Sequence, residues 1–236
     1  MAIRGVLFDK DGTLIDVTGT WVPVYRKLLG DVFPGLDLQA VEEKMALAGY
    51  DRNTGAFSAG SVLAGGTTRQ IVDIWWPGLD DNGIAEKIKL LDVDYRDLAM
   101  STLTPLMPLE PVLGALHRMN LRLGIGTNDT EQSARNHMEA LGVDNLFDVI
   151  LGADSVARAK PAGDMIHAFA GALGIAPEEV AMVGDNAHDI ETARDGGAGL
   201  AIGVLTGNSA SEHLDTIADH VVASIADLPR LLKDFV

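Results

Sequence analysis

The chain has 236 residues and a formal net charge of −16, from 18 Lys and Arg against 34 Asp and Glu. Apolar residues make up 47% and cysteine is absent, which excludes disulfides, thiolate metal sites and cysteine nucleophiles. The acidity disfavours nucleic acid and anionic membranes as partners, and no window approaches the ~20 apolar residues that span a bilayer, so we expect a soluble, cytoplasmic protein.

The first predicted element is a buried strand from Ile3 to Phe8, which runs directly into Asp9-Lys10-Asp11-Gly12-Thr13. Two carboxylates and a turn that exposes backbone N–H groups are a candidate site for phosphate and a divalent cation. Two plainer interpretations compete: a β-hairpin that turns at Asp11-Gly12, and a solvated loop. A calcium loop of the EF-hand type is excluded, because Thr13 and Leu14 stand where it needs Asp or Asn and then Gly.

The segment from residue 21 to about 100 has helical periodicity and no convincing strand. Apolar residues recur at helical spacing over 21–32 and 38–45, and further helices are predicted over 67–76, which Pro77 ends, and over 83–100. We therefore expect an all-helical insertion of roughly eighty residues.

Beyond Pro105 and Pro108, strands and helices alternate, which is typical of a parallel sheet with right-handed crossovers. The expected elements are helix 109–119, strand 121–126, helix 130–141, strand 146–151, helix 163–173, strand 180–183, helix 187–195, strand 199–204, a weak strand near 220–223 and helix 225–234. We predict an α/β fold with a doubly wound, Rossmann-like core formed by residues 1–17 and 101–236, and a helical cap formed by residues 18–100. The first strand then belongs to the later sheet, so the hairpin interpretation loses most of its weight.

Polar residues gather at the carboxyl ends of the predicted strands, where open α/β sheets bind ligands. They are Asp9 and Asp11 after the first strand, Thr127, Asn128 and Asp129 after strand 121–126, Asp185 and Asp189 after strand 180–183, and Lys160 in the loop before helix 163–173. Taken singly, residues 127–130 read as a helix cap, residues 184–186 as a turn and Lys160 as a solvated lysine. Their joint placement at one edge favours a shared site.

In this order, four motifs resemble those of the haloacid dehalogenase-like superfamily, specifically its phosphatases. They are Asp9-Lys10-Asp11-Gly12-Thr13, Thr127-Asn128, Lys160-Pro161 and Gly184-Asp185 followed three residues later by Asp189. The resemblance covers the whole chain, and the insertion is similar to the helical cap of the phosphoglycolate phosphatase-like branch. It implies hydrolysis of a small-molecule phosphate monoester, phosphoglycolate-like or a sugar phosphate, by a Mg²⁺-dependent monomer or homodimer.

The resemblance also implies a role for each motif residue. Asp9 is the nucleophile that forms an aspartyl-phosphate, and Asp11 is the general acid and base. Asp9, the backbone carbonyl of Asp11 and Asp185 are the implied Mg²⁺ ligands. The Thr127 hydroxyl, the Asn128 backbone N–H and the Lys160 ammonium contact the phosphoryl oxygens, and Asp189 orients Lys160 or a metal-bound water. Because dehalogenases of this fold need neither the metal nor a second carboxylate, Asp11 disfavours dehalogenation.

The motifs indicate the identity of the substrate less clearly than they indicate the reaction. Many phosphoglycolate phosphatases carry Asp-Ser directly after the first motif, whereas this chain has Asp16-Val17-Thr18. The cap candidates for contacting a substrate carboxylate lie near Gly-containing breaks: Tyr50, Arg52, Asn53 and Arg69. Exposure of these side chains on the cap surface is the competing interpretation. Two alternative functions stay open: a sugar-phosphate mutase of the same superfamily, and a catalytically silent regulator that binds a phosphorylated metabolite.

Overall fold

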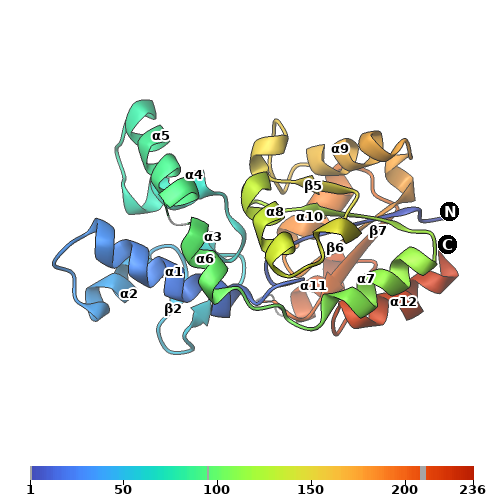
Figure 1. The fold of residues 1–236 in the computed structure, drawn as a ribbon, viewed down its shortest axis with the longest axis horizontal. Helices are drawn as coiled ribbons and strands as arrows, with labels where there is room; N and C mark the ends of the chain where they lie inside the picture. The colour runs from blue at the N-terminus through green and yellow to red at the C-terminus, as the bar shows by residue number, and fades with distance from the viewer. Residues whose placement is uncertain (1, 95, 208–210) are drawn as a thin grey trace.

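The computed structural model describes residues 2–94, 96–207 and 211–236. Within these residues, six parallel strands form one sheet in the order β5-β4-β1-β6-β7-β8 (Figure 1). The strands are β1 (Gly5–Phe8), β4 (Arg122–Gly126), β5 (Val149–Leu151), β6 (Val180–Gly184), β7 (Leu200–Val204) and β8 (His220–Val222). The predicted doubly wound α/β fold is confirmed, and the first strand of the chain lies inside the later sheet.

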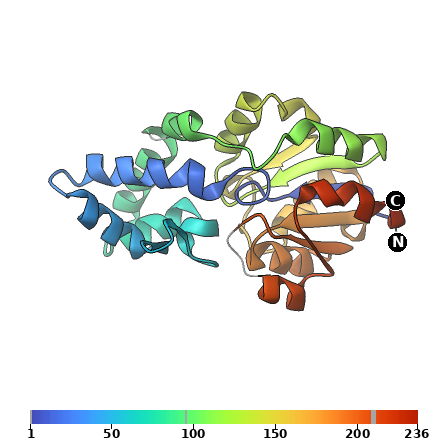
Figure 2. The same cartoon turned by 90° about the horizontal axis from the view of Figure 1, so that it is seen from below.

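Helices pack on both faces of this sheet (Figure 2). Strand β1 is buried on both sides, since Val6 and Phe8 join one apolar cluster and Leu7 joins another. This is why the strand reads as a continuous apolar run rather than an alternating one. On the first face lie α7 (Leu109–Arg118), α8 (Glu131–Ala140) and α12 (Leu228–Leu231), and on the second lie α9 (Asp164–Leu173), α10 (Ala187–Asp195) and α11 (Ser211–Ile217).

The register of the three central strands brings their carboxyl ends together. Phe8 is paired with Ile125 of β4 and with Val183 of β6. The three strands therefore end at nearly the same level of the sheet. The Asp9 N–H, one residue beyond β1, donates to the Val183 carbonyl at 2.8 Å. The polar residues that follow these strands therefore meet at one edge of the sheet.

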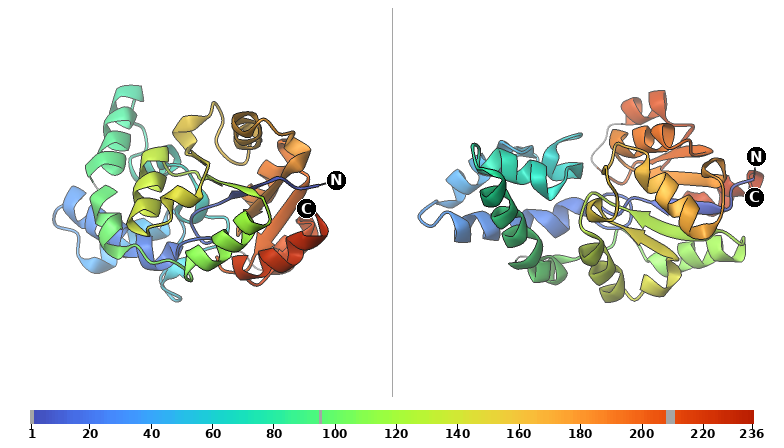
Figure 3. Two further views of the ribbon diagram at one scale, coloured as in Figure 1. Left: turned by 45° about the vertical axis from the view of Figure 1, so that its right-hand side comes forward. Right: turned by 90° about the horizontal axis from the view of Figure 1, so that it is seen from above.

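The insertion after β1 forms a helical cap at the end of the molecule away from both termini (Figure 1, Figure 3). Its elements are α1 (Val17–Val32), α2 (Leu38–Ala46), β2 (Tyr50–Asp51), β3 (Ala56–Phe57), α3 (Val62–Gly65), α4 (Thr68–Trp75), α5 (Asp81–Lys89), the π-helical turn η1 (Leu90–Asp94) and α6 (Arg96–Thr102). The cap has its own apolar cluster, which includes Leu28, Met45 and Trp75. On this ground we propose that residues 18–100 form one domain and residues 1–17 with 101–236 the other.

Two details of the cap differ from the sequence prediction. Strands β2 and β3 form an antiparallel hairpin where none was expected. Each has two residues, too few for an alternating pattern, and the turn is closed by the Gly55 N–H donating to the Asp51 carbonyl. The helix predicted over 83–100 is not continuous, because α5 ends at Lys89 and a π-helical turn follows it. Tyr95, within that range, lies outside the described residues.

Two details of the core also differ. Strand β5 begins at Val149 rather than at residue 146, since 144–146 form a 3₁₀ turn, η2. The closing helix predicted over 225–234 is divided into the 3₁₀ turn η5 (Ile225–Asp227), the short α12 and the 3₁₀ turn η6 (Leu232–Asp234). Among the described residues, no helix combines the length and the apolar character needed to cross a bilayer.

Candidate active site

A pocket lies between the cap and the carboxyl ends of the central strands, and residues from both sides line it. We call its polar side on the core the floor: Asp9, Asp11, Thr127, Asn128, Lys160 and Asp189. We call its apolar side on the cap the roof: Trp21, Tyr25, Leu28, Leu63, Ile71 and Leu91. Most of the side chains predicted for the site are thus brought into one pocket, and Asp185 lies beside Asp9.

The ammonium group of Lys160 bridges two carboxylates of the floor. Its Nζ lies 2.6 Å from Asp9 Oδ1 and 2.6 Å from Asp189 Oδ1, and all three residues are buried. Asn128 fixes the lysine backbone, because its side-chain amide accepts from the Lys160 N–H at 3.0 Å and donates to the Lys160 carbonyl at 3.2 Å. The positive charge is therefore held against the carboxylate that follows β1.

Asp189 is positioned by the first turn of α10. Asn186 is the N-cap of this helix, and its backbone N–H donates to Asp189 Oδ2 at 3.0 Å in a capping box. A Cβ at position 184 would overlap the Asp189 carboxylate, so the strand end that passes beside it requires Gly184. One oxygen of Asp189 thus contacts Asn186 and the other Lys160, an arrangement that suits the predicted orienting role.

A second buried lysine, Lys10, pairs with the other aspartate of the first motif. Its Nζ lies 2.8 Å from Asp11 Oδ2, 2.9 Å from Asp129 Oδ2 and 3.2 Å from His137 Nδ1, and the residue has no exposed surface. The indole Nε1 of Trp21, in cap helix α1, donates to Asp11 Oδ1 at 2.5 Å. Both oxygens of Asp11 are therefore held, and the two aspartates of the motif have separate partners.

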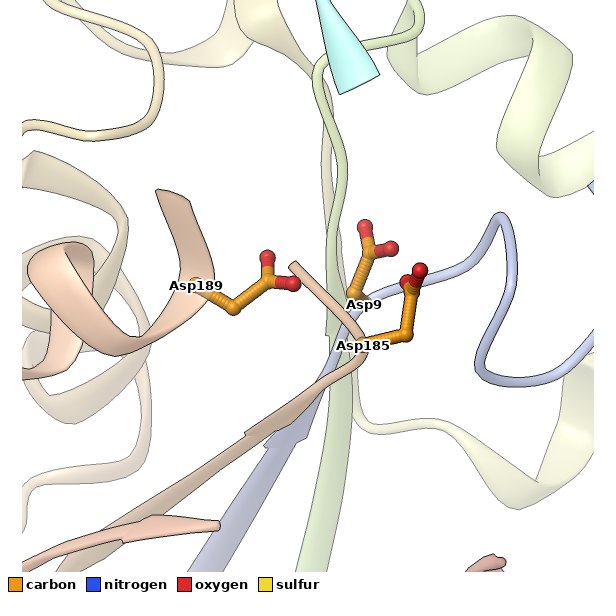
Figure 4. Close-up of side chains that lie close together, drawn as sticks. All are labelled: Asp9, Asp185 and Asp189. Atoms are coloured by element: carbon orange, nitrogen blue, oxygen red, sulfur yellow. The ribbon is translucent and has the colours of Figure 1, made fainter. Parts of the chain in front are cut away.

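Three buried carboxylates lie close enough to hold a metal ion (Figure 4). One oxygen each from Asp9, Asp185 and Asp189 lie within 4.8 Å of one another, and an all-oxygen set suits Mg²⁺. Both Asp189 oxygens contact the protein, one Lys160 and the other the Asn186 N–H, which suits the predicted orienting role of Asp189 beside the metal ligands Asp9 and Asp185. Gly12 and Gly207 pack directly against Asp185, where a Cβ would overlap its carboxylate. The donor set fits the predicted magnesium ion.

Burial and charge together set the ionisation of the Asp9–Lys160 pair. Burial raises the pKa of Asp9 to about 7, although the Lys160 ammonium opposes this rise. Burial would lower the pKa of Lys160, but the carboxylates of Asp189 and Asp9 outweigh it and raise that pKa above its ordinary value. The lysine is therefore charged at neutral pH, and additional positive charge beside Asp9 would favour the ionised carboxylate.

The same balance acts around Lys10. Burial would lower the pKa of Lys10, but the carboxylates of Asp11 and Asp129 raise it. Burial, and then the charge of Lys10, lowers the pKa of His137 to about 4, so this imidazole is neutral. Because an ammonium only donates, His137 Nδ1 is the acceptor and Nε2 carries the proton.

Thr127 and Asn128 complete the floor. Thr127 is 1% exposed, and its Oγ1 accepts from the Asp129 N–H at 3.1 Å, which leaves its proton available to a ligand. Asn128 Nδ2 also donates to the carbonyl of Gly65 in the cap at 2.8 Å. The cap is thus closed over the floor by a hydrogen bond from a residue predicted to contact phosphate.

The cap candidates for binding a carboxylate were wrongly predicted, because none of them lines the pocket. Arg52 pairs with Glu42 and Glu43, and Arg69 with Asp73, all on the outer surface of the cap. Tyr50 accepts from Arg26, and the backbone N–H of Asn53 bonds Asp51 in the β2–β3 turn. Conversely, the sequence gave no signal for His137, and it indicated no partner for Lys10 or for the strand-end residue Asp129. The available signal was the position of Lys10, between two aspartates at the end of a buried strand, which favours an ion pair with a neighbouring carboxylate.

Comparisons with known proteins agree with this geometry. A family model described as haloacid dehalogenase-like hydrolase matches residues 3–197. The phosphoglycolate phosphatase of Escherichia coli K12 is 29% identical to this chain, and that of Shigella dysenteriae serotype 1 is 30% identical. Each alignment covers 96% of this chain and 91% of the relative.

Solved structures share the fold over nearly the whole chain. A predicted phosphoglycolate phosphatase from Haemophilus somnus has a TM-score of 0.73 and 20% identity, and covers 98% of each chain. A phosphatase of the same superfamily from Thermococcus onnurineus has a TM-score of 0.69 and 23% identity, and also covers 98% of each chain. At these identities the likeness concerns the arrangement of core and cap.

Proposed function

This chain belongs to the haloacid dehalogenase-like hydrolase family and is a phosphatase, and we propose that it hydrolyses a small phosphate monoester through an aspartyl-phosphate on Asp9. The observation that carries the proposal is the separation of the two motif aspartates. Asp9 is paired with Lys160, whereas Asp11 is held by Lys10 and Trp21. Two carboxylates two residues apart thus have different surroundings, which suits different chemical tasks.

In the first transfer, the Asp9 carboxylate attacks phosphorus in line with the ester oxygen. The ester P–O bond breaks, and Asp11 gives its proton to the departing alkoxide. Lys160 and the Thr127 hydroxyl contact the phosphoryl oxygens, where charge concentrates as the bonds rearrange. Asn128 supports this step, since it fixes the backbone of Lys160.

In the second transfer, water attacks the phosphorus of the aspartyl-phosphate. Asp11, now ionised, takes a proton from this water, and the Asp9–phosphorus bond breaks to release inorganic phosphate and restore both carboxylates. Lys10 and Trp21 keep Asp11 in one position through both steps. The hydrogen bond from Asn128 to Gly65 keeps the cap over the site and limits the access of other water molecules.

Asp9, Asp185 and the backbone carbonyl of Asp11 would hold Mg²⁺, with Asp189 serving to orient Lys160. When bound, the ion would offset the repulsion between the Asp9 carboxylate and the phosphate dianion. Lys160 contributes a fixed positive charge to the same task. In a protein of net charge −16, these two cations would lower the repulsion that the phosphate dianion meets at the floor.

The test is release of inorganic phosphate from p-nitrophenyl phosphate. We expect turnover with Mg²⁺, loss of turnover with a chelator, recovery when Mg²⁺ is restored, and loss in Asp9→Asn. Asp144→Asn is the matched control, because Asp144 is an exposed aspartate far from the pocket. Turnover that persists in Asp9→Asn would refute the assignment of Asp9 as the nucleophile.

The two alternative functions give different results in the same assay. A mutase would convert a sugar phosphate to its isomer with little release of phosphate. A silent regulator would hydrolyse no ester of a broad panel, although ligands would still raise its melting temperature. Phosphate release as the main product argues against both.

A further inference from the structure

The roof of the pocket consists of apolar and aromatic side chains, of which the proposed chemistry uses only Trp21. Trp21, Tyr25 and Leu28 come from α1, Leu63 from α3, Ile71 from α4 and Leu91 from η1. None of these side chains is fully exposed, and Leu28 has no exposed surface although it lines the pocket. The space below the roof is therefore enclosed by apolar walls.

Positive charge is confined to the floor. Among the described residues that line the pocket, Lys160 is the one Lys or Arg side chain. The cap contributes a carboxylate instead, Asp92, which accepts from Thr68 Oγ1 at 2.8 Å. A leaving group with its own carboxylate would meet an apolar wall, and moving an unpaired carboxylate against such a wall is strongly unfavourable.

Two side-chain nitrogens at the seam between cap and core add an independent observation. Asn186 Nδ2 and His188 Nδ1 are buried and have no hydrogen-bond partner in the described part of the chain. Both residues line the pocket, and both nitrogens lie under Gly65 of the cap. An amide and an imidazole can each form a hydrogen bond to an oxygen, so this seam suits a single oxygen atom on the ligand.

We propose that the substrate is the phosphate monoester of an uncharged alcohol with an apolar body of about four or more carbons. The roof then packs against this body and discriminates against carboxylated alcohols such as glycolate. This inference rests on the proposed function and deepens it, because it names the chemical class of the leaving group. The chemistry stays the same: the ester P–O bond breaks and the alcohol leaves with the proton from Asp11.

Two matched pairs of substrates test the proposal. Ethyl phosphate and phosphoglycolate have the same two-carbon chain with and without a carboxylate, and n-butyl phosphate and 4-phosphonooxybutanoate form the corresponding four-carbon pair. We expect kcat/KM to rise by about fourfold for each added methylene among the neutral esters. Within each pair, we expect the carboxylated ester to be about 100-fold poorer than its neutral partner.

One cap variant tests the origin of this preference. In Leu91→Lys, which places a cation in the half-buried roof, the ratio of kcat/KM for the carboxylated ester to that for its neutral partner should rise about fivefold. The ratio is measured within one protein sample, so partial misfolding of a variant does not affect it.

The outcomes separate this inference from the proposed function. If p-nitrophenyl phosphate and every ester are inert, the proposed function fails and the inference falls with it. If p-nitrophenyl phosphate is hydrolysed but phosphoglycolate is a better substrate than ethyl phosphate, only the inference is overturned. Equal ratios in the wild type and in Leu91→Lys would likewise overturn the inference.

Discussion

The floor and the roof of the pocket differ in how they are built. The floor is charged, and each of its carboxylates contacts a lysine: Asp9 and Asp189 contact Lys160, and Asp11 contacts Lys10. The roof is apolar and is held by packing within the cap cluster. The difference suggests a division of work, in which the floor performs the reaction and the roof selects the leaving group.

This division has a simple structural origin. Floor residues follow strands whose register is fixed by the sheet, so small shifts are resisted by backbone hydrogen bonds such as that from Asp9 to Val183. Roof residues lie on helices of a separate apolar cluster, and contacts such as Trp21 to Asp11 and Asn128 to Gly65 join the cap to the floor. Substitutions in the floor should therefore alter the rate for all substrates. Those in the roof, apart from Trp21, which holds Asp11, should alter the preference among them.

The largest effect is expected for removal of the bridging charge in Lys160→Met. We expect kcat to fall by about 10⁴-fold for every ester, as for other fixed cations that stabilise transferring phosphoryl groups. Steady-state phosphate release measures it. Lys233→Met, at an exposed lysine, is the control and should retain wild-type activity. A loss of activity confined to one class of substrate would contradict the proposal that the floor performs the reaction for every substrate.

The next effect is expected for Asp11→Asn. General acid catalysis is worth about 10² to 10⁴ in rate, and it matters most when the leaving alkoxide is basic. We therefore expect kcat to fall by about 10³-fold for n-butyl phosphate and much less for p-nitrophenyl phosphate. Equal losses for the two esters would contradict the assignment of Asp11 as the acid.

Lys10→Met should lower stability, since it leaves Asp11 and Asp129 without their shared cation. Breaking a buried ion pair on one side costs about 3 kcal/mol or more in the free energy of unfolding. Urea denaturation measures this loss. The matched control is Lys27→Met, which removes an exposed ion pair with Asp31 and should cost less than about 0.5 kcal/mol. Similar losses in the two variants would contradict the structural importance of the buried pair.

His137 should make stability depend on pH. Its pKa is about 4 in the folded chain against about 6.5 when unfolded, so between these values the unfolded state binds the extra proton. Stability is therefore retained above pH 6.5 and lost as the pH falls, by about 2 kcal/mol between pH 7 and pH 5. Lys10, Asp129 and Asp11 are the charges that face the ring. In urea denaturation, the free energy of unfolding of His137→Gln should fall by about 2 kcal/mol less between pH 7 and pH 5 than that of the wild type. The same pH profile in both proteins would refute His137 as the source of the pH dependence.

The smallest effect is expected in the roof, for Ile71→Val. Loss of one methylene should lower kcat/KM for n-butyl phosphate by about fourfold at most and leave ethyl phosphate nearly unchanged. The ratio of the two esters is the measurement. An equal decrease for both would mean that Ile71 acts on the reaction rather than on the leaving group.

The residues that follow strands were the part of the site that sequence could predict. Asp9, Thr127 and Asp185 each follow an apolar run, and the carboxyl ends of parallel strands meet at one edge. The contact of Lys10 with His137 could not be predicted, because His137 lies inside helix α8 and not at the end of a strand. Arg52 lies in the turn between β2 and β3, and Arg69 lies on α4. The sequence pattern of a turn or of a helix does not tell which of its polar residues face the pocket.

The central claim is that the floor transfers the phosphoryl group twice, first to Asp9 and then to water. The stereochemical course at phosphorus tests it most directly, with a phosphate ester made chiral by oxygen isotopes and the reaction run in isotopically labelled water. Each in-line transfer inverts the configuration, so two transfers predict net retention. Net inversion would mean that water attacks the ester directly, and it would contradict the assignment of Asp9 as the nucleophile.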